Sequence, residues 1–198
     1  MTGSNNKIKT TNLVDILDIL KRGTLNNELD LQRALIADRK LRLLAEEDSS
    51  FKKLRSDLSE LIYAYEKAHW RDENKITDEQ IEESDLAEKI AEAERVFSKR
   101  RKELILSKLE ALNLKQQDLC SLLDHNKSYI SELLNGLRSF STGDLVIIHR
   151  LLKIELADLI PTTIPLETQN RIRQSLANIS SQQIKLNKNT LELRSTAR

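Results

Sequence analysis

Apolar residues recur at helical spacing along most of the chain, and its first third predicts three helices over residues 12–22, 27–47 and 50–69. Asn12 is placed to cap the first of these helices, and Gly23 is placed to end it. Each helix has a single apolar face, so the three must pack on one another or on a partner. Their inward positions are Leu13, Ile16, Leu17, Leu20, Leu31, Ala34, Leu35, Leu41, Leu44, Leu54, Leu58, Leu61, Ile62 and Tyr65.

A longer helical segment begins at Thr77, which forms a capping box with Gln80. Its first part is strongly acidic, and the sign of the charge reverses at the basic run 99–102. We expect a bend or a break near residues 96–98, and the change of sign places a domain boundary between residues 96 and 97. The apolar positions that then supply the first helix of the next domain are Leu104, Ile105, Leu109 and Leu112.

Residues 114–160 predict four short helices with tight joints. Three leucines share one face of the segment 116–123, and a polar joint follows at residues 124–126. Asn126 can cap the next helix and Gly136 can end it in the left-handed conformation. Within that helix Ile130, Leu133 and Leu134 face inward. The side chains left pointing outward, with hydrogen-bonding groups and no packing role, are Lys127, Ser128, Tyr129, Ser131 and Glu132.

The joint after this helix is also specified locally. Ser141 caps a further helix and Asp144 completes a capping box, while Phe140 packs against Leu145 as a hydrophobic staple. We therefore expect the loop 137–140, which carries Arg138, to be held tightly.

Residues 114–160 resemble the XRE family of lambda-repressor-like helix-turn-helix domains. Three positions depart from the family pattern: Asp124 replaces the usual turn glycine, Lys153 a second common glycine, and Lys115 the usual Ser or Thr cap. Aspartate tolerates a left-handed backbone better than most residues, so we expect the turn to be kept. The positions that carry the resemblance are Leu114, Gln116, Leu119, Ile130, Ser131, Asn135, Gly136 and Arg138.

The resemblance implies that helix 127–134 enters the major groove of DNA, where base pairs differ in donors, acceptors and the thymine methyl group. Because one such helix reads few bases, we expect a homodimer on a palindromic operator. The basic run 99–102 could equally contact only solvent. Expected base contacts come from Lys127, Ser128, Tyr129, Ser131 and Glu132. Expected phosphate contacts come from Gln116, Asn135, Arg138, Arg100 and Arg101.

Together with this domain, residues 30–70 resemble the helical region that precedes the DNA-binding domain in HigA-like antitoxins. That resemblance implies an antitoxin that binds an RNA-cleaving toxin of the RelE type and represses its own operon. One alternative is a repressor without a toxin, from a phage or mobile element. A second alternative is a helical protein-interaction adaptor whose helix-turn-helix has lost DNA binding. The resemblance is carried by Leu31, Ala34, Leu35, Leu44, Leu54, Leu61, Ile62, Tyr65 and Glu66.

The acidic segment 72–94 suits a toxin partner, because a protein that cleaves RNA needs a basic surface. The same segment could equally be a solvated helix face, and Trp70 could be a core or hinge anchor rather than a contact. Expected partner contacts are Trp70, Ile81, Glu82, Leu86 and Ile90.

Composition agrees with an all-α fold, since only 4% of the residues are aromatic and the chain of 198 has 4 Gly and 2 Pro. The net charge of +1 conceals segregated charges, and the single cysteine makes no internal disulfide. No apolar run approaches the length of a bilayer span, so we expect a cytoplasmic protein.

No enzyme, cofactor or metal site is expected. A site built from Cys120, His125 and His149 is conceivable, but it would occupy the turn and core of the helix-turn-helix. The expected organisation is a flexible terminus (1–11), a partner-binding and dimerisation region (12–96), the DNA-binding domain (97–161) and a basic C-terminal extension (162–198). In the extension, residues 166–179 have a weak helical stripe, and residues 184–193 fit a helix or a hairpin.

Overall fold

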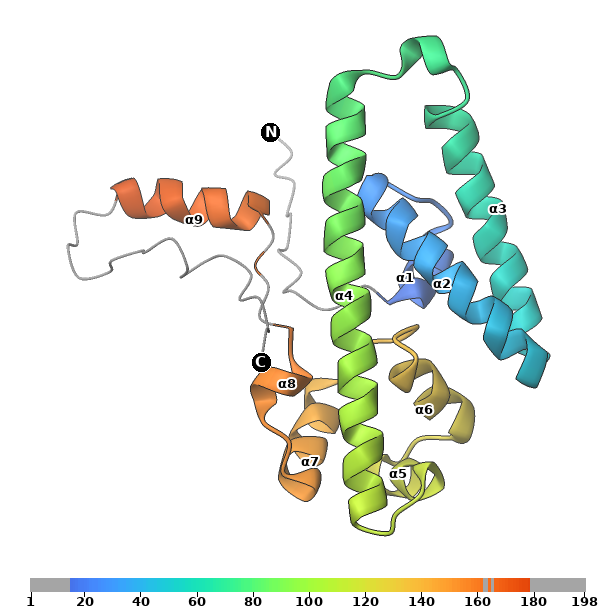
Figure 1. Cartoon of the computed structure of the whole chain (residues 1–198), viewed down its shortest axis with the longest axis vertical. Helices are drawn as coiled ribbons and strands as arrows, with labels where there is room; N and C mark the ends of the chain where they lie inside the picture. Colours follow the sequence, from blue (N-terminus) through green and yellow to red (C-terminus); the bar gives the residue numbers. More distant parts are fainter. Residues whose placement is uncertain (1–14, 162–163, 165, 179–198) are drawn as a thin grey trace, which may run out of the picture. The chain divides into compact units, whose positions relative to one another are not determined.

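The computed structural model describes residues 15–161, 164 and 166–178. The regular elements in these residues are helices, with no strand among them, which confirms the all-α prediction (Figure 1). Among the described residues, 15–159 form one compact unit that holds helices α1 to α8. Helix α9, Leu166–Asn178, belongs to a second unit. The expected flexible terminus and the helix-or-hairpin segment 184–193 lie outside the described residues.

The first three helices are α1 (Ile16–Arg22), α2 (Glu28–Glu47) and α3 (Phe51–His69), close to the predicted ranges. Helix α1 starts later than expected, because the Asp15 carboxylate accepts a 2.8 Å hydrogen bond from the Leu17 N–H and acts as the cap in place of Asn12. Gly23 ends α1 with φ of 72°, as predicted.

Helix α2 packs against both α3 and α4 (Figure 1). The apolar core around it takes one residue, Leu137, from the far half of the chain, where it lies in the connection after α6. The buried members of this N-terminal core are Ile16, Ile19, Leu25, Leu31, Ala34, Ala37, Leu41, Phe51, Leu58, Ile62, Tyr65 and Leu137.

Helix α4 runs without interruption from Asp78 to Ala111, so the predicted bend near residues 96–98 is wrong. Small residues explain the continuity: Ala87, Ala91 and Ser98 are buried along one face, where α2 can approach closely. Further along, Ile105 and Leu109 enter a second core. The boundary expected between residues 96 and 97 therefore falls within one continuous helix that serves both halves.

The start of α4 is only partly as expected. The Thr77 hydroxyl accepts a 3.2 Å hydrogen bond from the Gln80 N–H, as in a capping box. The Gln80 side chain does not reach back to Thr77 but donates to the His69 carbonyl oxygen over 3.0 Å. A short 3-10 turn, Glu73–Lys75, precedes the helix.

The second half holds α5 (Gln116–Leu123), α6 (Lys127–Leu134), α7 (Thr142–Leu152) and α8 (Leu156–Leu159), which are the four short helices predicted. They surround a C-terminal core with the end of α4. Among the helices that the structure describes, none combines the length and apolarity required to cross a bilayer. The buried members of this core are Ile105, Leu109, Leu119, Leu123, Ile130, Leu133, Leu134, Phe140, Ile148, Leu152, Ile154 and Leu159.

Candidate nucleic-acid interface

The turn between α5 and α6 is fixed at both ends. Asp124 has the left-handed conformation, with φ of 55°, as expected for this substitute for glycine. His125 Nε2 lies 3.0 Å from a carboxylate oxygen of the buried Asp144, which ties the turn to the start of α7. The Asn126 side chain accepts from the Tyr129 N–H over 2.8 Å and caps α6. The direction of α6 is therefore set by one left-handed residue, Asp124, and by two side-chain contacts.

The expected base-contacting residues fall into two groups. Lys127 and Ser128 are exposed in the first turn of α6, whereas Tyr129, Ser131 and Glu132 are half-buried. The first turn also carries backbone N–H groups and the positive end of the helix dipole, which favour a phosphate or the electronegative edges of bases. The first turn is thus the most accessible part of the predicted reading surface.

The half-buried group is joined to Arg138 in one network. Arg138 Nε donates to the Glu132 carboxylate over 2.9 Å, and the guanidinium lies 4.3 Å from the centre of the Tyr129 ring. Tyr129 also contacts the His125 ring, with the ring centres 4.4 Å apart. Burial acts to lower the pKa of Arg138, but the hydrogen bond and charge of Glu132 outweigh it and raise the pKa. Glu132 thus holds Arg138 in place and neutralises most of the positive charge that Arg138 could offer to a phosphate.

Asn135 is also engaged within the fold. Its side-chain nitrogen donates to the Ser131 carbonyl oxygen over 2.9 Å, and its side-chain oxygen accepts from Lys102 Nζ over 2.8 Å. Its own carbonyl oxygen accepts from Lys40 Nζ over 2.9 Å. These contacts place two cations at the C-terminus of α6, where the helix dipole is negative.

The other expected phosphate contacts differ sharply in exposure. Gln116, at the start of α5, is exposed, and so is Arg100, whose closest acidic partner is Asp158 at 3.5 Å. Arg101 is only 4% exposed: it donates to the Leu159 carbonyl oxygen over 3.2 Å and lies 4.8 Å from the centre of the Phe140 ring. Burial lowers the pKa of Arg101 to about 10, so it stays charged at neutral pH. The expectation that Arg101 contacts phosphate does not fit this placement. Arg101 lies on the face of α4 that packs on the C-terminal core, so its side chain points away from solvent.

The end of α6 forms a Schellman motif. The Gly136 N–H donates to the Leu133 carbonyl oxygen over 3.1 Å, and the Leu137 N–H donates to that of Glu132 over 2.9 Å. The motif turns the chain so that Leu137 enters the N-terminal core, where its side chain is fully buried. The Leu137 carbonyl oxygen also accepts from the Ile16 N–H over 3.1 Å.

The C-terminal part of α2 lies beside α6. Lys40 contacts the C-cap of α6, and the charge of Lys127, at the opposite end of α6, acts on Asp48, which follows α2. The pKa of the Asp48 carboxyl is lowered chiefly by hydrogen bonds from Ser50, and the charge of Lys127 lowers it further. Sequence reasoning missed Lys40 and this arrangement, because nothing in the local pattern of α2 indicates a residue 95 positions away.

The expected partner-binding residues do not form one continuous exposed surface. Ile81 is 46% exposed and Leu86 is 44% exposed on α4, Glu82 is exposed, and Ile90 is half-buried. Trp70 is half-buried, and its indole N–H donates to the buried Glu28 carboxylate over 3.0 Å. This contact supports a role for Trp70 as an anchor of the fold.

The residues weighed as a metal site are each engaged separately. His125 contacts Asp144, His149 Nδ1 lies 2.7 Å from the Ile154 carbonyl oxygen, and the Cys120 thiol is 3.5 Å from the Gln116 carbonyl oxygen. Within the described ranges, no cluster of three or more His, Cys, Asp or Glu side chains could hold a metal ion.

Comparison with known proteins adds one finding to this geometry. Residues 105–159 match the family model described as Helix-turn-helix. This segment is an XRE-type helix-turn-helix domain, a DNA-binding domain. The match starts within the last third of α4 and ends with α8, so the domain begins inside a helix that it shares with the N-terminal core. No curated protein and no solved structure matches the chain significantly.

Proposed function

We propose that the protein represses its own operon by binding operator DNA through α6, and that its N-terminal half binds and neutralises an RNA-cleaving toxin of the RelE type. The observation that supports the DNA-binding part most directly is the exposure of Lys127 and Ser128 in the first turn of a firmly capped α6. The protein itself performs no catalysis in this proposal, because its role is to cover the toxin's RNA-binding surface.

The repressor acts as a homodimer on a palindromic operator, since two helices spaced one turn of DNA apart read enough bases for specificity. The twofold interface is proposed on α7 and α8 rather than in the expected dimerisation region 12–96, because both helices expose apolar side chains. Val146 is 38%, Ile147 36%, Leu151 50% and Leu156 40% exposed. Side chains of this kind are typical of the centre of a subunit interface.

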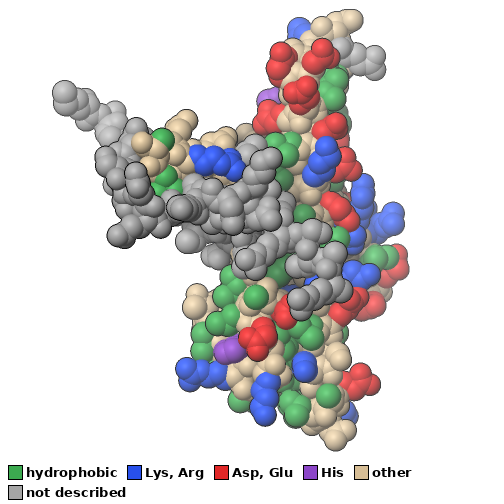
Figure 2. Space-filling view, turned by 60° about the vertical axis from the view of Figure 1, so that its left-hand side comes forward, with side chains coloured by type: hydrophobic (Ala, Val, Ile, Leu, Met, Phe, Trp, Pro, Cys, Tyr) green, Lys and Arg blue, Asp and Glu red, His purple; other side chains and the backbone are tan. Residues whose placement is uncertain are grey.

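The toxin-binding part rests on the N-terminal half of α4. Acidic side chains gather in the upper part of Figure 2, where this half of the helix lies. Exposed Ile81 and Leu86 interrupt the acidic surface. Acidic groups attract a basic protein and speed its encounter, and apolar contacts then slow its release.

The hydrogen bond from Lys40 on α2 to the C-cap of α6, together with the burial of Leu137 in the N-terminal core, supports coupling between the two activities. A partner that changes the packing of the N-terminal core would displace Leu137, which follows the C-terminus of α6 directly. The same observation also favours the alternative, a repressor without a toxin. The N-terminal helices already have a structural role in enclosing Leu137, and that role needs no partner.

Co-expression with the neighbouring gene distinguishes the two. A short, basic neighbouring protein that is toxic alone and harmless with this chain supports the antitoxin, and pull-down should recover the pair. The double variant Ile81→Asp with Leu86→Asp should lose both rescue and capture. The matched control Val96→Asp, at a side chain 49% exposed on the same helix, should retain them. A neighbour whose expression never harms growth contradicts the toxin-binding part.

DNA binding is tested with the protein's own promoter fragment. Affinity should fall steeply as salt rises, because lysine and arginine release counterions from the phosphates. Binding that is absent at low salt would favour the third possibility, an interaction adaptor without DNA binding.

A further inference from the structure

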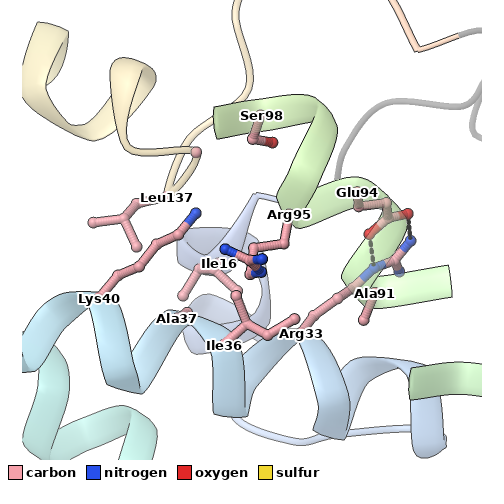
Figure 3. A pocket seen from close by; sticks show the side chains of 11 residues that line it. Ile16, Arg33, Ile36, Ala37, Lys40, Ala91, Glu94, Arg95, Ser98 and Leu137 are labelled. Atoms are coloured by element: carbon pink, nitrogen blue, oxygen red, sulfur yellow. Dashed lines mark hydrogen bonds and ion pairs between the residues drawn. The ribbon is translucent and has the colours of Figure 1, made fainter. Parts of the chain in front are cut away.

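A small cavity lies between α2, α4 and the connection after α6. Its volume is about 40 Å³, which compares with about 30 Å³ for one water molecule in the liquid. Lys40 enters it from α2, Arg95 enters from α4, and Ser98 lies at its edge beside Gly136 (Figure 3). The backbone of the α6 C-terminus therefore forms part of its wall.

The lining of this cavity carries excess positive charge. Its acidic residue, Glu94, is already occupied by Arg33, whose Nε donates to the carboxylate over 2.8 Å (Figure 3). Arg95 is paired with Glu92 on the exposed face of α4. Within the described part of the chain no ion pair involves Lys40, and its contact to the Asn135 carbonyl oxygen supplies only a neutral acceptor.

The surroundings of Lys40 disfavour its positive charge. Burial, followed by the like charges of Arg95, Lys102 and Arg101, lowers the pKa of Lys40 to about 8. A half-buried cation without a counterion is unfavourable, and an anion beside it offsets the charge repulsion and part of the desolvation cost.

We propose that this cavity binds one phosphate-type oxyanion. Lys40 Nζ is one donor at its wall, and Arg95 supplies the other through Nη1, because Arg95 Nε and Nη2 each donate to Glu92 over 2.6 Å. A tetrahedral oxyanion offers several acceptor oxygens, which matches donors arriving from two helices. Inorganic phosphate and the terminal phosphate of a small metabolite share this chemistry, as does a phosphate of the DNA backbone.

The position of the site gives the anion a regulatory consequence. It joins α2 to α4 directly beside the C-cap of α6, so a bound anion strengthens the junction between the N-terminal core and the DNA-binding domain. This inference is independent of whether a toxin exists.

The experiment uses the full chain and inorganic phosphate. Thermal unfolding is followed at pH 7 while phosphate replaces chloride at constant ionic strength. The melting temperature should rise saturably, by about 4 °C at a tenfold excess over Kd. Lys40→Met should abolish the rise. Arg95→Gln should increase the phosphate concentration needed for a half-maximal rise at least tenfold. The control Lys53→Met changes a lysine that is 85% exposed on α3, and it should respond as wild type does.

An equal, non-saturating rise in wild type, Lys40→Met and Lys53→Met would overturn the site, because it would reflect the general exclusion of phosphate from protein surfaces. Lys40→Met removes a desolvated charge, so it should fold, and circular dichroism checks this. If it does not fold, Arg95→Gln decides the question alone. A phosphate titration of the operator complex then identifies the source. If phosphate weakens operator binding, the site binds a phosphate of the DNA backbone. If phosphate leaves operator affinity equal or higher, the site binds a free anion.

Discussion

Lys40 Nζ donates a 2.9 Å hydrogen bond to the carbonyl oxygen of Asn135, the residue that caps the C-terminus of α6. The two residues are 95 positions apart, so the contact joins the N-terminal helices to the helix that carries the predicted base contacts. A cation at this end of a helix also stabilises its dipole. The N-terminal half is therefore part of the support of α6.

Leu137 is the apolar counterpart of this contact. Leu137→Ala should lower the free energy of unfolding by about 3 kcal/mol, because a fully buried side chain leaves a cavity in the N-terminal core. Urea unfolding measures the change, and hydrogen exchange should show lost protection in α1 and α2. Leu112→Ala, at a side chain 52% exposed, should change stability by less than about 0.5 kcal/mol. Equal effects of the two variants would contradict the docking of Leu137.

Gly136 should tolerate alanine poorly. Its φ of +69° is strained for any residue with a side chain, and an added Cβ would lie 3.3 Å from Ser98 Cβ. Gly23 has a similar φ of +72° with open space around it, so Gly23→Ala measures the strain alone, about 1 kcal/mol. Thermal or urea unfolding should show a larger loss for Gly136→Ala. The helical Gly143, in contrast, should gain about 0.5–1 kcal/mol from alanine. Identical losses at Gly136 and Gly23 would mean that the approach to Ser98 adds nothing.

Adjacent arginines on α4 should behave in opposite ways. Arg101→Ala should cost about 2–4 kcal/mol of stability, because it removes a buried side chain packed on Phe140 and its bond to the Leu159 carbonyl oxygen. Arg100→Ala should leave stability within about 0.5 kcal/mol. If Arg100 contacts phosphate, its loss should reduce the slope of log affinity against log salt by about one. Chemical denaturation and promoter titrations check the pair, and a stable Arg101→Ala protein would refute the burial.

The desolvated Lys40 should make stability depend on pH in anion-free buffer. Its pKa in the folded protein, about 8, lies below the ordinary 10.5, because of burial and of Arg95, Lys102 and Arg101 on α4. Below pH 8 both states carry the proton and the cost is fully present. Between about pH 8 and 10.5 the folded state releases its proton first, so wild type gains stability. Relative to Lys40→Met the gain should be on the order of 1 kcal/mol by urea unfolding. A difference between the two proteins that is constant from pH 7 to 10 would contradict this placement of Lys40.

Local signals in the sequence were sufficient for the helix-turn-helix. Asn126, Gly136 and the Ser141–Asp144 capping box act over three or four residues, and each is found as predicted. The left-handed backbone of Asp124 likewise follows from local sterics. These features position α6, so the most exposed part of the candidate interface could be located before the structure.

Long-range packing was beyond the same reasoning. The charge reversal in α4 suggested a break, but charge on a solvated face does not interrupt backbone hydrogen bonds when small residues face a neighbouring helix. Arg101 belonged to a basic run, and only the tertiary fold shows that one of its members turns inward. Lys40 contacts Asn135, and Leu137 enters the N-terminal core. No spacing in the sequence indicates either of these long-range contacts.

The most direct measurement is the affinity of the protein for its own promoter fragment, by fluorescence anisotropy at fixed salt. The double variant Lys127→Ala with Ser128→Ala changes only exposed side chains in the first turn of α6. Lys89→Ala removes one exposed lysine from the acidic half of α4 and serves as the control for charge. The double variant should bind at least about tenfold more weakly than wild type, while the control binds within about twofold. Equal affinity of the double variant and the control would show that α6 does not read the operator.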